Sequence, residues 1–226
     1  MEMKVLKRNL DEAKIKKEFK KVLWFYDFWG SLTESKAAKK VLKLADIKNG
    51  NAVLDVACGT GEMLKKIIKL NPEGENTGID ISPDMIAKAR KKLAKQNQNN
   101  LMLEEGNALN LNFKDNSFDI LINNYMVDLM PIESFNKIAS EFYRVLKPKG
   151  IIVMSTFSFG TKRIHRFWYW VAKRFPDLLT GCRPVSFKDY LIKVGFEIEK
   201  NIEISQNTFP SKIIKARKID KTTKNT

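Results

Sequence analysis

The stretch V-L-D-V-A-C-G-T-G-E at residues 53–62 decides the fold class. Its first five residues form a short, mainly apolar run typical of a strand, and glycines follow at positions 59 and 61. A helical pattern then continues from Met63 to Leu70. The stretch therefore predicts a strand, a glycine turn and a helix. Such a turn lets a ligand approach the backbone, and the helix N-terminus offers it unpaired N–H groups.

Strands and helices alternate along the rest of the chain. Further strands are predicted at 76–81, 100–105, 118–123, 151–156, 196–204 and 209–217. Helices are predicted at 9–29, 32–45, 83–96, 133–146, 163–175 and 186–194. This alternation predicts an α/β fold with a doubly wound sheet covered on both faces. The last two strands can form an antiparallel hairpin, so we expect a Rossmann-like, seven-stranded mixed sheet with one antiparallel edge strand.

Length and composition fit a single domain. The chain has 226 residues, of which 43% are hydrophobic and 30% charged, and it contains no apolar run long enough for a membrane span. The first residues lack the apolar region of a secretory signal, which favours a cytoplasmic location. Four regions are expected: N-terminal helices forming a lid (1–48), a ligand-binding core (50–156), substrate-side helices with the terminal hairpin (157–217), and a flexible tail (218–226).

The chain is strongly basic, with a formal net charge of +15. Such a charge favours an anionic partner: nucleic acid, an anionic lipid surface or an acidic substrate. Lysine-rich helices that only solvate the surface explain it equally well. Residues 162–174 join large aromatic side chains to five basic ones without an acid, which favours peripheral contact with an anionic membrane at its inner face. Trp24, Phe28 and Trp29 are secondary candidates for the same contact.

The spacing after the glycine turn limits the kind of nucleotide. The third glycine of a dinucleotide fingerprint is replaced by Leu64, and no phosphate-binding loop motif occurs. Asp80 follows Gly59 by 21 residues at the end of the second strand. This position suits a carboxylate that accepts hydrogen bonds from both ribose hydroxyls. The alternative for Asp80 is a surface acid that caps the next helix.

Several segments together resemble one family. The run at 53–62 resembles the first motif of class I S-adenosylmethionine-dependent methyltransferases, and G-I-D-I-S at 78–82 resembles their acidic loop. G-N-A-L at 106–109, F-D-I at 118–120 and Y-R-V-L-K-P-K-G at 143–150 are similar to later family segments. The chain resembles most the methyltransferases of ubiquinone and menaquinone biosynthesis. This resemblance implies S-adenosylmethionine as cofactor and S-adenosylhomocysteine as product.

The resemblance also implies roles for particular residues. Asp55 orders the glycine turn or binds the amino group of the methionine moiety, Asp80 holds the ribose, and Ile81 packs on the adenine. The other residues implied in cofactor binding are Cys58, Gly59, Thr60, Gly61, Asn107, Ala108 and Asn123. The family often has Asp where Asn107 stands. Asn can still accept from the adenine amino group, though more weakly than a carboxylate, and its alternative role is that of a turn residue.

Candidate catalytic residues are spread over three segments. Tyr125 and Asp128 follow the fourth strand, where the alternatives are a loop turn and a helix cap. His165 is the only histidine, and basic neighbours disfavour its charged form; the alternatives are a base near neutral pH and a solvent-facing side chain. Tyr26 with Asp27 resembles a pair that closes over the cofactor in related quinone methyltransferases, so Tyr26 is a candidate lid residue.

The expected reaction is an in-line methyl transfer to a small acceptor, which can be lipophilic, in a pocket that positions it and excludes water. The chemistry requires no metal, and the widely separated Cys58 and Cys182 do not have the spacing of a zinc site. The alternative is an RNA-directed methyltransferase or a nucleic-acid-binding protein of this fold. Only the basic charge suggests that alternative. A third reading is a protein of this fold that has lost catalysis.

Overall fold

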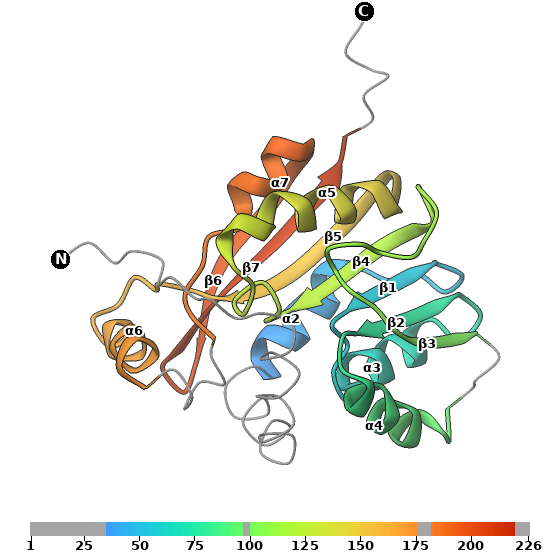
Figure 1. Cartoon of the computed structure of the whole chain (residues 1–226), viewed down its shortest axis with the longest axis horizontal. Helices are drawn as coiled ribbons and strands as arrows, with labels where there is room; N and C mark the ends of the chain where they lie inside the picture. Colours follow the sequence, from blue (N-terminus) through green and yellow to red (C-terminus); the bar gives the residue numbers. More distant parts are fainter. Residues whose placement is uncertain (1–34, 97–99, 176–181, 220–226) are drawn as a thin grey trace, which may run out of the picture.

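A seven-stranded sheet forms the centre of the molecule (Figure 1). The structure is a computed structural model that describes residues 35–96, 100–175 and 182–219. The strands are β1 (Val53–Val56), β2 (Asn76–Asp80), β3 (Leu101–Glu105), β4 (Phe118–Asn124), β5 (Leu146–Phe157), β6 (Phe196–Gln206) and β7 (Phe209–Lys218). They lie in the order β3-β2-β1-β4-β5-β7-β6, and β7 runs antiparallel to the other six strands. The predicted fold class is confirmed, with the β6–β7 hairpin at the sheet edge.

Helices cover both faces of this sheet. They are α2 (Ser35–Ala45), α3 (Glu62–Leu70), α4 (Pro83–Leu93), the short 3₁₀ helix η1 (Ile132–Ser134), α5 (Phe135–Val145), α6 (His165–Arg174) and α7 (Lys188–Val194). Buried side chains of α5 and α7 pack with one face, and buried side chains of α2, α3 and α6 pack with the other. None of the helices in the described ranges is long and apolar enough to cross a membrane.

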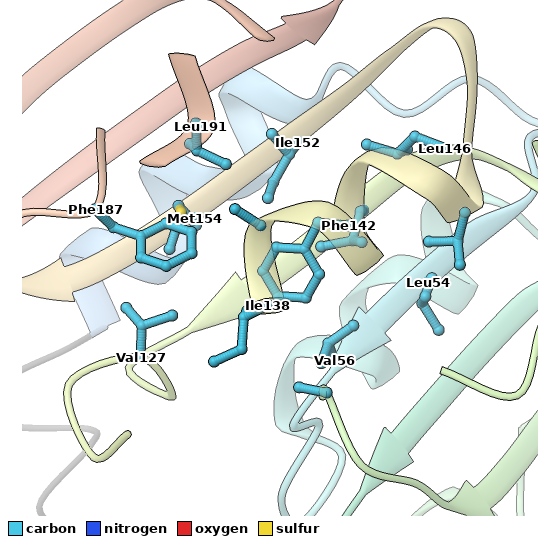
Figure 2. Packing of buried hydrophobic residues seen from close by; sticks show 14 of the residues in the cluster. Leu54, Val56, Val127, Ile138, Phe142, Leu146, Ile152, Met154, Phe187 and Leu191 are labelled. Carbon is cyan, nitrogen blue, oxygen red and sulfur yellow. The ribbon is translucent and has the colours of Figure 1, made fainter. Parts of the chain in front are cut away.

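The core between α5 and the sheet is built from large apolar side chains (Figure 2). Phe142 and Ile138 project from α5 toward the strands, and both are fully buried. Leu54 and Val56 of β1 extend this cluster to the end of the strand that leads into the glycine turn. Truncating one such phenylalanine typically costs about 3–5 kcal/mol of stability, so this core holds the turn in place.

The boundary between α5 and β5 differs from the prediction of a helix to 146 and a strand from 151. The helix ends at Val145, and Leu146 already pairs with Phe118 before the register shifts. Lys149 has a left-handed backbone with φ of 63°, and a side chain at Gly150 would approach the Lys147 carbonyl to 2.8 Å. The P-K-G segment therefore forms an irregularity within β5.

The C-terminal strand reaches one residue into the segment expected to be a flexible tail. Lys218 is buried, and its Nζ donates hydrogen bonds to the carbonyls of Tyr143 and Leu146 and to Oδ1 of Asn116. Its ammonium group also lies 4.4 Å from the centre of the Tyr143 ring. The end of β7 is therefore anchored to the C-terminal end of α5, where unpaired carbonyls favour a cation.

The described part of the N-terminal region belongs to the core. Ala37, Val41 and Ala45 recur four residues apart on α2 and are buried against the sheet. The backbone N–H of Lys36 donates to Oε1 of Gln206 at 2.6 Å, which joins the start of α2 to the end of β6. The expected helix at 9–29 and Tyr26 lie outside the described residues, as does the start expected for the 32–45 helix.

Candidate functional site

The glycine turn after β1 has a backbone that ordinary residues rarely adopt. Ala57, Gly59 and Gly61 have φ of 60°, 55° and 83°. A side chain at Gly61 would lie 3.2 Å from atoms of Ala89 and Leu93, so the glycine lets α3 and α4 approach closely. A side chain at Gly59 would meet no atom within 4 Å. The turn therefore combines backbone strain with open space beside Gly59, which is typical of a ligand site.

Asp80 ties the end of β2 to this turn. Its Oδ2 accepts a hydrogen bond from the backbone N–H of Gly59, and its Oδ1 accepts one from Ser82, both at 2.9 Å. Burial raises the pKa of the Asp80 carboxyl above its ordinary value, while the backbone hydrogen bonds oppose that rise. The oxygen of Ser82, not Asp80, accepts from the backbone at the start of α4. Asp80 is thus a buried turn-ordering carboxylate and not the surface cap considered above.

Asp55 of β1 is the second buried carboxyl near the turn. It is 1% exposed, and its Oδ2 has no hydrogen-bond partner among the described residues. Burial and then the charge of Asp80 raise the pKa of Asp55 from 3.8 to about 8. Asp55 is not among the residues that line the cavity beside the turn. A buried carboxyl oxygen without a partner is unfavourable, so this group is unusual for a strand interior.

A cavity of about 700 Å³, including its opening to solvent, adjoins the turn and Asp80. Most of its lining comes from the carboxyl ends of β1, β2 and β4 and the loops that follow them. The lining residues are Val56, Ala57, Gly59, Asp80, Ile81, Met85, Gly106, Asn107, Ala108, Asn124, Tyr125, Met126, Leu129 and Met130.

The segment expected to meet the adenine lines the cavity. Ile81, Asn107 and Ala108 are all among the lining residues. The Oδ1 atom of Asn107 accepts a hydrogen bond from the backbone N–H of Leu109 at 2.9 Å, and its carbonyl accepts one from Asn110. Asn107 therefore is a turn residue, as its alternative role predicts, and it also lines the cavity.

The two asparagines that end β4 have different surroundings. Asn123 is fully buried, and its Nδ2 donates to the carbonyl of Val56 at 2.9 Å, so it joins β4 to β1 without lining the cavity. Asn124 does line the cavity, and its Oδ1 accepts from the hydroxyl of Ser155. Its Nδ2 has no partner among the described residues and is available to a ligand. The amide at the cavity wall is therefore that of Asn124, one residue beyond the predicted Asn123.

Tyr125 is the predicted catalytic candidate that lines the cavity. It is 3% exposed, and its backbone is left-handed with φ of 50°. Its hydroxyl forms a 2.6 Å hydrogen bond with the hydroxyl of Ser211 in β7. Strained backbone conformations in non-glycine residues cluster at functional sites, and Tyr125 shares this feature with Ala57 across the cavity lining.

Asp128 and His165 do not line the cavity. Asp128 is fully buried, and its Oδ2 accepts from the backbone N–H of Phe157 at 2.7 Å. The carbonyls of Asp128 and Met130 accept hydrogen bonds from the buried guanidinium of Arg183. Asp128 therefore joins the loop after β4 to the end of β5, and Arg183 holds the same loop by its backbone.

His165 is buried, so the solvent-facing alternative is wrong. Its Nδ1 accepts from the backbone N–H of Lys162 at 3.2 Å and lies 3.8 Å from Oε1 of Glu203. Burial lowers the pKa of His165, Glu203 opposes this change, and Lys162 adds to it. The expectation that its charged form is disfavoured agrees with this direction. Its surroundings, however, belong to the β5–α6 connection and not to the cavity.

Three other predicted residues support the turn without lining the cavity. Cys58 is buried, its backbone N–H donates to Ile79, and burial raises the pKa of its thiol. The hydroxyl of Thr60 accepts a hydrogen bond from Nζ of Lys92 at 2.9 Å. Gly61 packs against α4. Within the described ranges, no cluster of His, Cys, Asp or Glu could hold a metal ion.

Four large apolar lining residues were not predicted as site residues from the sequence. They are Met85 in α4 and Met126, Leu129 and Met130 in the loop after β4. Three of these four are methionines, whose flexible side chains adapt to a ligand of varied shape. The available signal was the spacing of Met126, Leu129 and Met130, at three and four residues. In a loop, however, such spacing does not place side chains on one face.

A family model for a methyltransferase domain matches residues 47–180 of this chain. A demethylmenaquinone methyltransferase of Listeria monocytogenes is 35% identical over 144 residues, which cover 62% of this chain and 60% of that protein. The enzyme of the same name from Lactobacillus johnsonii is 31% identical over 179 residues, covering 76% and 72% of the two chains. The chain thus spans about three fifths of the length of the Listeria relative.

Solved structures show the same fold. The crystal structure of the cyclase SpnF superposes with a TM-score of 0.77 at 18% sequence identity, covering 94% of this chain and 98% of that one. At this identity the likeness establishes the fold of the sheet and its helices and nothing about the reaction.

Proposed function

Because the chain belongs to the class I S-adenosylmethionine-dependent methyltransferases, we propose that it transfers a methyl group to a small, lipophilic acceptor. The observation that carries the proposal is the shared cavity. One hollow is lined by Gly59 and Asp80 of the cofactor side and by Met126, Leu129 and Met130 of the loop after β4. A cofactor and an apolar acceptor can therefore meet in one place.

The residues around the turn fit S-adenosylmethionine. Asp80 offers a buried carboxylate for the ribose hydroxyls, and Ile81 and Met85 offer apolar surface for the adenine. Asp55 does not line the cavity, but its buried carboxyl has an oxygen without a partner among the described residues, and we assign this carboxyl to the ammonium group. Gly59 leaves space for the ligand against the backbone. When bound, S-adenosylmethionine supplies an electrophilic methyl group for in-line displacement.

The chain's own residues orient the acceptor and exclude water. The apolar loop of Met126, Leu129 and Met130 supplies a surface that favours an aromatic ring or an aliphatic tail. Of the described residues that line the cavity, Asp80 and Tyr125 are ionisable. Asp80 is assigned to the ribose, so the Tyr125 hydroxyl, which also hydrogen-bonds Ser211, is the group we propose to receive or orient an acceptor proton. The names of the relatives support a quinone-like ring with an apolar tail.

A second hollow, beside β5, β6 and β7, is a poor alternative for this reaction. It is lined by Ser158, Lys188, Glu203 and Lys212 among others, and it includes no residue of the glycine turn. Its empty volume is about 690 Å³, similar to that of the first cavity. The chemistry of their linings distinguishes the two hollows.

A lipophilic acceptor resides in a membrane, so we propose that the protein works in the cytoplasm against the inner face of a membrane. We also propose that the N-terminal residues that include Tyr26 close over the cavity. The alternative of an RNA acceptor rests on the basic charge alone, and the mainly apolar lining of the cavity does not favour it.

The test combines binding with transfer. The purified protein is incubated with methyl-labelled S-adenosylmethionine and either demethylated quinols of increasing tail length or bulk RNA, and label is counted in the organic and RNA fractions. We expect label in the quinol fraction, increasing with tail length. Label in RNA alone would overturn the acceptor class. S-adenosylmethionine binding by calorimetry, without transfer to any acceptor offered, would support a protein of this fold that has lost catalysis.

A further inference from the structure

Helix α6 exposes an aromatic face. Phe167 and Trp170 are 50% and 52% exposed, and Ile164 and Phe175 at the two ends of the helix are each 46% exposed. Phe167 and Trp170 are three residues apart and share one side of the helix. The other side carries the buried residues His165, Val171 and Ala172, which pack into the molecule. The exposed side chains Ile164, Phe167, Trp170 and Phe175, with the basic residues between them, are called the α6 patch below.

The aromatic rings of the α6 patch contact one another. The rings of Phe167 and Trp170 are stacked with centroids 6.1 Å apart, and Trp170 meets Phe175 edge-on at 5.6 Å. They form one contiguous apolar surface. A contiguous exposed patch of this kind marks an interaction site more often than single exposed side chains do.

Basic side chains alternate with these rings along the segment. The five in this segment are Lys162, Arg163, Arg166, Lys173 and Arg174, and all are exposed. None of the five forms an ion pair with a described residue, and residues 161–175 include no acid. The guanidinium of Arg174 lies 5.3 Å from the centre of the Phe175 ring. The patch thus offers unneutralised positive charge around an apolar centre.

The α6 patch is connected to the cavity wall by aromatic contacts. The ring of Tyr125, which lines the cavity, is 6.4 Å from that of Phe209, and Phe209 meets Trp168 of α6 at 5.4 Å. Trp168 in turn contacts Phe167 at 5.6 Å. Since β5 runs parallel to β1 and β4, the helix that follows it lies at the same carboxyl ends of the strands as the cavity (Figure 1).

We infer that the α6 patch docks on the surface of an anionic lipid bilayer. Aromatic side chains favour the interface between headgroups and acyl chains, and basic side chains favour anionic headgroups. Nucleic acid fits less well, because the rings are packed against each other instead of being separated for base stacking, and Ile164 has no ring to stack. Only the biological purpose of the docking rests on the proposed function. Vesicle binding needs no methyl transfer, so each can fail without the other.

The test is co-sedimentation of the full-length protein with phosphatidylcholine vesicles that contain or lack phosphatidylglycerol. One variant pair removes charge (Arg163→Glu with Arg166→Glu) and another removes rings (Phe167→Ala with Trp170→Ala). Matched controls change exposed residues elsewhere: Lys69→Glu with Lys91→Glu, and Leu70→Ala with Ile192→Ala. The charge control alters net charge by the same amount, and Leu70 and Ile192, at 50% and 49% exposure, match the rings in exposure.

We expect wild type to bind vesicles that contain phosphatidylglycerol and to bind neutral vesicles weakly. Each basic residue near an anionic leaflet contributes about fivefold (about 1 kcal/mol), so the charge variant should bind at least about 30-fold more weakly. The ring variant should lose about 10-fold or more, also at high salt where charge is screened. Both controls should stay within about threefold of wild type, because the charge control lies outside the α6 patch, where salt screens its effect, and the apolar control removes no side chain of the patch.

Several results would overturn the inference. One is equal binding to neutral and anionic vesicles, and another is an equal loss in a control and its matched variant. A third is a variant that loses an RNA gel shift while its vesicle binding is unchanged, which would assign the patch to nucleic acid. Conversion of a dimer into a monomer with unchanged vesicle binding would assign it to a second copy of the chain. Circular dichroism and thermal melting should match wild type, since the altered side chains are exposed.

Discussion

The backbone N–H of Gly59 donates a 2.9 Å hydrogen bond to the carboxylate of Asp80, which joins two segments that are 21 residues apart. Gly59 follows the first strand and Asp80 ends the second, so the bond holds the glycine turn against the neighbouring strand. The same carboxylate accepts from Ser82 at the start of α4. One buried acid therefore orders the turn and stands at the cavity wall.

Replacement of Asp80 is expected to weaken cofactor binding more than it weakens the fold. Asp80→Asn keeps the size of the side chain but loses the charge, and hydrogen bonds to charged groups contribute about 1.5–3 kcal/mol each. We expect S-adenosylmethionine to bind about 100-fold more weakly, measured by calorimetry. Asp84→Asn, an exposed acid in the first turn of α4, is the control and should bind as wild type does. Near wild-type affinity in Asp80→Asn and Asp80→Ala would remove Asp80 from the ribose role.

Gly61 and Gly50 form a matched pair for testing how the turn is packed. Both have left-handed backbones, with φ of 83° and 97°. A side chain at Gly61 would meet Ala89 and Leu93 at 3.2 Å, whereas one at Gly50 would meet nothing within 4 Å. We expect Gly50→Ala to lower the free energy of unfolding by about 1 kcal/mol through backbone strain alone. Gly61→Ala should lower it by about 2–3 kcal/mol because crowding adds to strain. Urea denaturation measures both free energies of unfolding. Equal losses would show that α4 shifts to accommodate the added methyl group.

The elements of the sheet could be predicted because apolar strands and amphipathic helices alternate in this chain with few interruptions. The start of β5 could not, since Pro148 and Gly150 indicate a break in the sequence while Leu146 already pairs with Phe118 in the structure. Pairing between distant strands overrides such local signals.

The cavity wall formed by Gly59 and Asp80 was also predictable, because the spacing of these two residues reflects the geometry of two adjacent strands. The apolar wall was not. Met126, Leu129 and Met130 come from one loop whose course is set by Asp128, which binds the backbone of Phe157, and by Arg183, which binds two loop carbonyls. Contacts across such sequence distances leave no periodicity. For the same reason, the sequence did not show that Asn124 lines the cavity and that Asn123 does not.

Stability should depend on pH through Asp55. Its pKa in the folded protein is about 8, raised from 3.8 by burial and by Asp80. The folded state then keeps a proton that the unfolded state releases, so stability is highest below about pH 4 for this group and falls as the pH rises toward 8. At about 1.4 kcal/mol per pKa unit, the fall has an upper bound of about 6 kcal/mol.

Asp55→Asn tests this assignment. The amide does not titrate, so the variant should be more stable than wild type at pH 8, and its urea midpoint should change less between pH 5 and pH 8. Because Asp80 is also buried with a raised pKa, part of the pH dependence should remain. S-adenosylmethionine affinity should fall in the same variant if the Asp55 carboxylate pairs with the ammonium group. A pH dependence as steep as in wild type would assign the effect to other groups.

Tyr125 and Ser211 allow a chemical role of the phenol to be separated from a structural one. Their hydroxyls share a buried 2.6 Å hydrogen bond, and Tyr125 alone of the two lines the cavity. Tyr125→Phe keeps the ring against Phe209 and removes the hydroxyl, while Ser211→Ala removes only the partner of that hydroxyl.

If the phenol receives or orients the acceptor proton, Tyr125→Phe should lower kcat by about 100-fold with little change in KM, in the range of general acid–base contributions. Ser211→Ala should lose about 1 kcal/mol of stability from the loss of this buried hydrogen bond, yet keep kcat within about threefold. Equal kcat in the two variants, measured with the same quinol acceptor, would leave Tyr125 as a wall residue and shift the search for a proton acceptor to the substrate itself.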